Sequence, residues 1–221
     1  MERMGKRGPD KAPPLVIDPK TGAPVGIDKG WGYNVGEAAF GKQLSAEVMN
    51  DWRAQGAKAW EKLTPGNWRS QDRPERIPAD STKTKLGPKL TSAEEAAKAL
   101  TKIMGDEERI YTLPSGGRVL VNAENLASHI DLDRTPFLPL LPEVLTDPYE
   151  AWVSFEQHKG TGKVVLRQRL IKMLQLDKER GVLVTAQAKN GVLEAWTMVP
   201  TSDRKYLNNQ RAGKLLWGRE E

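Results

Sequence analysis

The sequence of 221 residues contains no cysteine and only two histidines, His129 and His158. Without cysteine, the chain can form no disulfide bond, no thiolate zinc site and no cysteine nucleophile. It also lacks a G-x-S-x-G nucleophile elbow, a dinucleotide-binding glycine motif, and acidic residues clustered at metal-ligand spacing. We therefore expect a protein that uses neither a bound metal nor a cofactor.

Long apolar runs are missing as well. No stretch approaches the ~18 consecutive apolar residues that indicate a membrane-spanning helix. The N-terminus carries charges without an apolar segment behind them, which is unlike a secretory signal. We therefore expect no transmembrane segment, no secretion signal and no membrane partner.

Hydrophobic content is low, at 38%, and the mean hydropathy is -0.59. Most of the 15 prolines and 20 glycines fall in the first half of the chain. This composition favours one modest domain behind an extension over a single large domain. The net charge of +5 and the pI near 9.3 suit an anionic partner such as nucleic acid, although many ordinary basic proteins share them.

The chain divides into four parts on this basis. Residues 1–35, rich in proline and glycine, are predicted to form an extended arm. Residues 36–64 are predicted to be helical, because Leu44, Val48 and Trp52 recur four apart. Residues 65–90 contain four prolines and are predicted to be a linker. Residues 91–221 then form the folded domain.

The domain has the pattern of an α+β fold. A helix follows Ser92, which with Glu95 has capping-box spacing, and it ends at Gly105. A hairpin comes next, and then a short helix that Asn122 caps and that ends on His129. Strands near Trp152 and over residues 163–176, 182–188 and 192–199 are joined by tight turns. We predict helices packed on a four-stranded antiparallel meander sheet.

His129 is the main candidate for chemistry, because histidine can move a proton near neutral pH. A histidine at a helix end is more often a surface or capping residue. Arg134 follows closely and could bind a phosphate with two hydrogen bonds. His158 lies in the glycine-rich loop HKGTGK, which does not match the phosphate-binding Walker pattern. This loop is predicted to be a hairpin turn, and contact with a nucleic-acid backbone is the less favoured alternative.

Cations line one face of the strand that begins at Lys163, because Arg167 and Arg169 are two residues apart and so lie on the same face. Such a face is usually solvated, and it can instead bind phosphate. In the last strand of the meander, alternation places Thr197 with Ala195 and Val199, opposite Trp196. Near the C-terminus, the apolar residues 215–217 are predicted to dock on the core and to hold Tyr206 and Arg211 against the sheet.

Two patches of the sequence resemble known families. The segment GIDKGWGYNVG, with Trp31, Tyr33 and Asn34, resembles part of Mu-like and SPP1-like phage head morphogenesis proteins, with Val35 in place of the usual proline. The C-terminal half resembles the nuclease domain often fused behind that segment, of the Barnase–EndoU–Colicin–RelE (BECR) fold group. The landmarks are His129 with Arg134, the turn DPYEAW that ends at Trp152, the Lys163 strand, Thr197, and YLNNQRAG over residues 206–213.

This resemblance implies a ribonuclease that works without a metal. A base would take the proton of a ribose 2′-hydroxyl, cations would stabilise the phosphate charge, and an acid would protonate the leaving oxygen. The catalytic residues would be His129, Arg134, Lys163, Arg167, Thr197, Tyr206 and Arg211. Substrate contacts would come from Arg169, His158 and Trp152.

The resemblance also implies partners and places of action. RNA, including tRNA, would be the substrate, phage head or portal proteins would bind the arm, and an inhibitor or immunity protein would block the site. The protein would act in the virion or the host cytoplasm. Two alternatives remain open: a structural module of a phage head without catalysis, and a nucleic-acid-binding domain without chemistry. The nuclease hypothesis predicts that His129, Thr197 and at least two of the cations Arg134, Lys163, Arg167 and Arg211 converge in one cleft.

Overall fold

The computed structural model describes residues 15–17, 24–27, 66–157, 164–189 and 192–220. The predicted helical segment lies outside these ranges. So does most of the predicted arm, apart from β1 (Leu15–Ile17) and β2 (Pro24–Ile27), which pair in antiparallel fashion.

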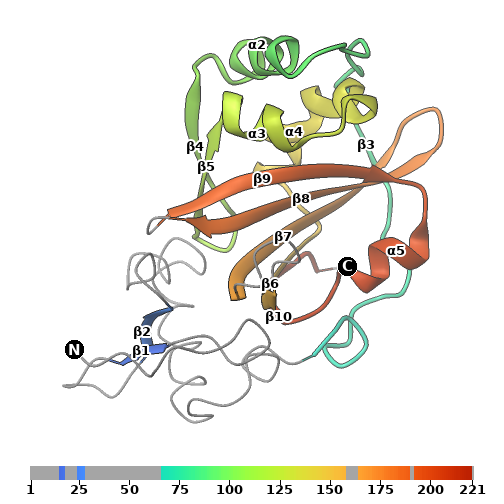
Figure 1. Ribbon diagram of the computed structural model, residues 1–221. Coiled ribbons are helices and arrows are strands. Elements are labelled where there is room, and N and C mark those ends of the chain that lie inside the picture. Colours follow the sequence, from blue (N-terminus) through green and yellow to red (C-terminus); the bar gives the residue numbers. More distant parts are fainter. Residues whose placement is uncertain (1–14, 18–23, 28–65, 158–163, 190–191, 221) are drawn as a thin grey trace.

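The predicted meander forms the middle of a larger sheet (Figure 1). Its strands are β6 (Glu150–Gln157), β7 (Val164–Gln175), β8 (Glu179–Lys189) and β9 (Val192–Thr201), each antiparallel to the next. The α+β class is therefore confirmed.

The predicted size of four strands is wrong, because the sheet has eight. β10 (Lys214–Gly218) adds to β6, so the C-terminal apolar residues dock as a strand. At the other edge, β5 (Arg118–Asn122) lies parallel to β9, and β4 (Glu108–Thr112) pairs with β5 as the predicted hairpin. A short strand, β3 (Asp80–Ser81), pairs with the end of β7. These additions satisfy backbone groups that an isolated meander would leave unpaired at its edges.

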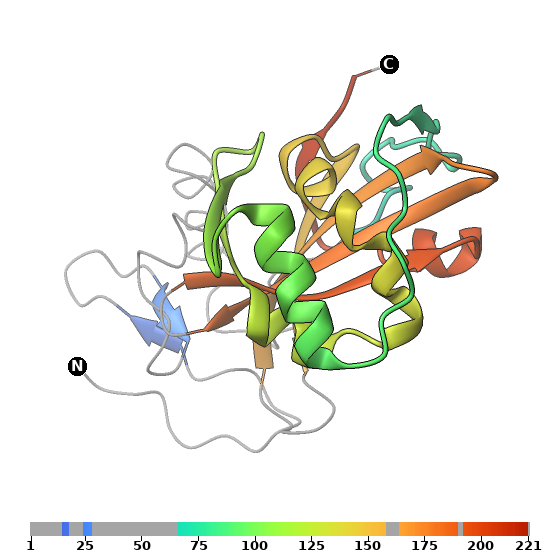
Figure 2. The same cartoon turned by 90° about the horizontal axis from the view of Figure 1, so that it is seen from above.

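Helices cover one face of the sheet (Figures 1 and 2). They are α2 (Ala93–Met104), α3 (Ala123–His129), the 3-10 helix η3 (Leu132–Leu140) and α4 (Leu141–Thr146). The predicted caps are present: Ser92 Oγ accepts the N–H of Glu95, Asn122 Oδ1 accepts the N–H of Asn125, and Gly105 ends α2 at φ 83°. The main core lies between these helices and the sheet. No helix within the described ranges is long and apolar enough to cross a membrane.

A second apolar cluster lies on the opposite face of the sheet, which we call the underside. The short helix α5 (Arg204–Asn209) contributes Leu207 to it, and the segment ahead of β3 contributes Ile77. The sheet contributes residues from β6, β7 and β8, namely Trp152, Ile171, Met173 and Leu183. One end of the underside is therefore covered.

Residues 66–90, predicted to be a linker, pack along the sheet and are called the strap below. The strap starts on the underside, where Ile77 is 2% exposed, and pairs with β7 through β3. It then passes to the side of the helices, where the N–H of Leu90 donates to Thr135 Oγ1 at 2.8 Å. The strap therefore joins the two faces.

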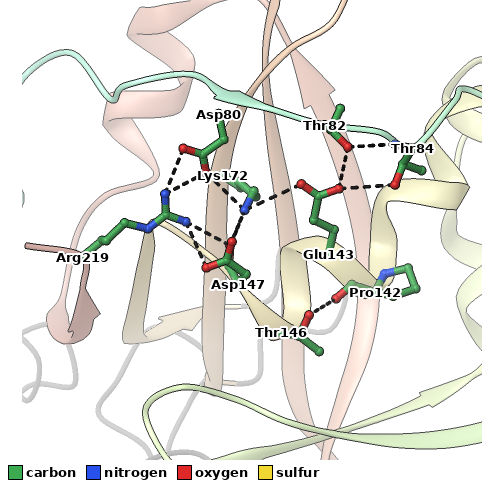
Figure 3. Close-up of polar contacts among 9 residues, drawn as sticks. All are labelled: Asp80, Thr82, Thr84, Pro142, Glu143, Thr146, Asp147, Lys172 and Arg219. Atoms are coloured by element: carbon green, nitrogen blue, oxygen red, sulfur yellow. Dashed lines mark hydrogen bonds and ion pairs between the residues drawn. The ribbon is translucent and has the colours of Figure 1, made fainter.

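A group of ion pairs, the Lys172 cluster, fixes the middle of the strap (Figure 3). Lys172 is almost fully buried, and its Nζ lies 2.6 Å from Asp147 Oδ2, 3.2 Å from Asp80 Oδ2 and 3.7 Å from Glu143 Oε1. Arg219 also binds Asp80, at 2.7 Å, and Asp147, at 3.0 Å. The cluster thus ties the strap to β7, to α4 and to the end of the chain after β10.

Candidate functional site

A bulge in β9 decides which side chains reach the open part of the underside. Thr197 pairs with Thr185, but Ala195 pairs with Ala186, so Trp196 is an extra residue in β9. Such a residue shifts the alternation of faces. Ala195 accordingly lies in the main core, whereas Val199 packs against the underside cluster. The prediction that Thr197 shares a face with Ala195 is therefore wrong, because strict alternation does not hold across the bulge.

A row of polar residues continues the underside beyond its apolar cluster. Thr197 lies opposite Thr185, which lies opposite Arg169, and Arg167 lies opposite Ser154. These residues are spaced by twos from Val199, Leu183, Ile171 and Trp152, so they point the same way. Arg167 and Arg169 share a face, as predicted. We call the set the polar sheet face; its members are Ser154, Glu156, Arg167, Arg169, Thr185 and Thr197.

His129 lies at the rim of the polar sheet face, beside Thr197. β5 pairs with β9 at Glu194, and α3 follows β5 directly, so α3 lies along the next residues of β9. Asn125 Nδ2 donates to Glu194 Oε1 at 2.6 Å, and Thr197 Oγ1 donates to the carbonyl of His129 at 3.4 Å. The His129 ring stacks on Trp196, with 3.7 Å between centroids and 37° between planes. The bulge residue thus supports the histidine.

The hydrogen bonds of His129 define the role of each ring nitrogen. Nδ1 lies 2.7 Å from the carbonyl oxygen of Asn125 and 3.0 Å from Ser128 Oγ. A carbonyl oxygen only accepts, so Nδ1 carries the proton in the first contact. In the neutral ring, Nε2 then has a lone pair that can take a proton. Because the side chain is exposed, a substrate can reach it.

Two guanidinium groups surround one carboxylate on the polar sheet face. Arg167 Nη1 lies 3.1 Å from Glu156 Oε2, and Arg169 Nη2 pairs with Glu156 Oε1. Arg169 Nη1 also donates to Ser154 Oγ at 3.2 Å, while its Nε is buried without a partner in the part of the chain that the structure describes. The group keeps one surplus positive charge. Sequence reasoning missed Glu156; its two-residue spacing from Ser154 was the available signal.

Arg211 and Trp152, predicted at the site, meet elsewhere. Arg211 is fully buried and binds Glu150 through two bonds of 2.6 Å, Nε to Oε2 and Nη2 to Oε1. Trp152 Nε1 donates to the same carboxylate at 2.8 Å, and Arg73 of the strap joins it at 2.9 Å. These residues form an enclosed polar centre under β6, where neither side chain faces solvent.

The remaining predicted residues are dispersed or undescribed. Arg134 is half-buried in η3, and Tyr206 is exposed on α5. No contact within the described ranges joins either side chain to His129. Lys163 and His158 lie outside the described residues. Of the cations predicted to converge with His129 and Thr197, Arg167 is the one that the described residues place on the polar sheet face, where Arg169 accompanies it. Arg134 and Arg211 lie elsewhere.

Comparison with family models gives one match. Residues 95–218 match the model described as phage-Barnase-EndoU-ColicinE5/D-RelE like nuclease2. The match spans both the helices and the sheet, including every residue of the polar sheet face. Comparison with curated proteins and with solved structures finds no match.

Proposed function

The chain belongs to the family of phage-Barnase-EndoU-ColicinE5/D-RelE like nucleases, and on that premise we propose that it cuts RNA at the polar sheet face. The observation that carries the proposal is the position of His129 at the end of a row that contains two guanidinium groups. Its carbonyl accepts from Thr197, and its ring stacks on Trp196. The side chains of Arg167 and Arg169 are 22% and 11% exposed, so this face is partly accessible. A proton acceptor and cations on one such face are what cleavage by a ribose 2′-hydroxyl requires.

His129 serves as the general base in this proposal. Its Nε2 takes the proton of the 2′-hydroxyl, and the oxygen attacks the adjacent phosphorus. The O2′–P bond forms, the P–O5′ bond breaks, and the leaving oxygen takes a proton from solvent. The products are a 2′,3′-cyclic phosphate and a 5′-hydroxyl. The contact of Nδ1 with the Asn125 carbonyl and the stacking on Trp196 hold the ring in place for this step.

Arg167 and Arg169 stabilise the phosphate as its charge grows. Guanidinium groups bind phosphate oxygens with paired, charge-assisted hydrogen bonds. Glu156 holds both groups before substrate arrives, which reduces the cost of ordering them. The hydroxyl of Thr185 lies between the arginines and Thr197, where it can donate to a phosphate oxygen.

The test is cleavage of total RNA and of tRNA by the purified full chain, in the presence of a chelator. We expect the parent to cut and His129→Ala to lose about 10²- to 10⁴-fold in kcat/KM. Glu124→Ala, an exposed change on the same helix, should stay within about twofold of the parent, which separates loss of the base from disturbance of α3.

The products provide a second criterion. Ends with a 2′,3′-cyclic phosphate, together with resistance of DNA, support attack by the 2′-hydroxyl. Equal cleavage by the parent and by His129→Ala would overturn the role of His129. RNA that is bound but left intact by the parent would instead support the binding domain without chemistry.

A further inference from the structure

A groove opens between the start of the strap and α5, on the far side of the molecule from α2. Its volume is about 660 Å³, within the range of about 300–1,000 Å³ usual for ligand sites. The residues that matter for its chemistry are Trp68, Arg69, Glu75, Arg204, Lys205 and Asn209. In Figure 1, the first part of the strap lies beside α5.

The groove carries a surplus of positive charge. It contains three cations, Arg69, Arg204 and Lys205, against one acid, Glu75. Arg204 and Lys205 are exposed, and neither forms an ion pair within the described ranges. Concave sites lined by one sign of charge concentrate the field that attracts an oppositely charged ligand. The groove is therefore suited to an anion with more than one negative charge.

The floor of the groove is rigid and partly aromatic. The backbone N–H of Trp68 donates to the carbonyl of Arg211 at 2.9 Å, and Asn208 Oδ1 accepts from Arg211 Nη1 at 2.9 Å. Arg211 is itself held by the buried carboxylate of Glu150. The exposed guanidinium of Arg69 stacks over the Trp68 ring, 4.7 Å from its centroid. The buried guanidinium of Arg211 also lies over this ring, 5.3 Å from its centroid. A planar base can therefore stack on the exposed guanidinium of Arg69.

The groove and the polar sheet face lie on the same side of the sheet. Trp68 packs against the underside cluster, to which Leu207 of α5, Ile171 and Leu183 belong. Ile171 is two residues from Arg169 on the same strand, which is about 7 Å along the sheet. A linear polyanion with planar bases can occupy both places at once. This geometry favours a nucleic-acid strand over an acidic protein surface.

We propose that the groove binds phosphates and a base of a single-stranded RNA whose neighbouring segment lies on the polar sheet face. This inference rests on the proposed function for the identity of the strand. It adds a substrate-binding site that lies apart from the reacting atoms.

The experiment measures binding of a fluorescent 2′-O-methyl RNA oligonucleotide to the full chain by anisotropy. The 2′-O-methyl group blocks attack, so binding is read without cleavage. Arg204→Gln/Lys205→Gln should bind about tenfold more weakly at low salt. The negative slope of log affinity against log salt should become shallower by about 1.4. Lys83→Gln/Lys85→Gln, which removes two exposed cations on the strap outside the groove, should retain parental affinity.

Each outcome distinguishes the groove from the catalytic proposal. Weaker binding by the groove variant alone supports the groove, even if the parent cuts no RNA. Unchanged binding and slope overturn it, even if RNA is cut in a manner dependent on His129. Equal losses in both double variants also overturn it, because they indicate attraction by net charge. If the oligonucleotide is unaffected but polyglutamate binds the parent and not the groove variant, the groove takes an acidic protein and the inference fails.

Discussion

Arg211 shows at the scale of one residue how a cation in a nuclease-like pattern can serve stability. Its guanidinium and the Glu150 carboxylate are both fully buried and joined by two short bonds. We expect Arg211→Met to lower the free energy of unfolding by about 3 kcal/mol, because it leaves a buried carboxylate with less compensation. Urea denaturation measures this change.

The strap provides the matched control for Arg211. Arg76 pairs with Glu179 at the surface, and Arg76→Met should cost under about 1 kcal/mol. If Arg211→Met is as stable as Arg76→Met and yet cuts no RNA, then Arg211 acts in catalysis, as the sequence predicted.

Glu156 controls the charge of the polar sheet face. Glu156→Gln leaves both arginines but removes the carboxylate that pairs with them. We expect the 2′-O-methyl oligonucleotide to bind severalfold more tightly, with a salt slope steeper by about 0.7, because one more cation is available to phosphate. Glu179→Gln, a change at the first residue of β8, should leave the slope as it is. Weaker binding by Glu156→Gln would contradict this expectation and show that the carboxylate chiefly orients the arginines.

At the scale of one element, α3 determines where His129 lies. The helix has seven residues, and Asn122 caps its first turn. We expect Asn122→Ala to cost about 1 kcal/mol of stability and to reduce RNA cleavage, with rescue of both by Asn122→Ser. Ser92→Ala removes an equivalent cap from α2 and should cost a similar amount of stability while cleavage persists. Equal cleavage by the two alanine variants would show that the cap at Asn122 does not position His129 for cleavage.

Elements that depend on local signals were predictable from the sequence. Each of these signals involves residues that are close together in the sequence. Examples are the caps at Ser92 and Asn122, the glycine that ends α2, and the alternating strands joined by short turns. The pairings of β10 with β6 and of β5 with β9 join distant parts of the chain, and no local pattern specifies them. The bulge at Trp196 was also missed, because an extra residue in a strand leaves no mark on its composition. The face of Thr197 was therefore assigned wrongly with respect to Ala195.

At the scale of the whole molecule, the Lys172 cluster makes stability depend on acid. Partial burial of Asp80 alone would raise the pKa of its carboxyl, but hydrogen bonds and charges from Arg219 and Lys172 outweigh burial and lower that pKa. A lowered pKa in the folded state means that the contribution is present above about pH 4 and is lost as pH falls below it. We expect Asp80→Asn to reduce stability by about 1 kcal/mol at pH 6 and by less at pH 3, measured by urea denaturation.

Asp133→Asn is the matched control for Asp80. Asp133 pairs with Lys89 at the exposed surface, where solvent screens the interaction. Its effect on stability should be small at both pH values. The lowered pKa of Asp80 would be contradicted if the difference in free energy of unfolding between the parent and Asp80→Asn stayed the same from pH 6 to pH 3.

The polar centre at Glu150 also has a consequence for the order in which the domain is completed. Arg73 precedes Glu150 by 77 residues, and Arg211 follows it by 61. The meander can pair during synthesis before Arg211 has been made. Closing the underside at that stage would bury a carboxylate without its principal counter-charge, at a cost of several kcal/mol. We therefore expect this surface of the nascent sheet to stay in contact with solvent until β10 has been made, and the segments around Arg73 and Arg211 to close on it together.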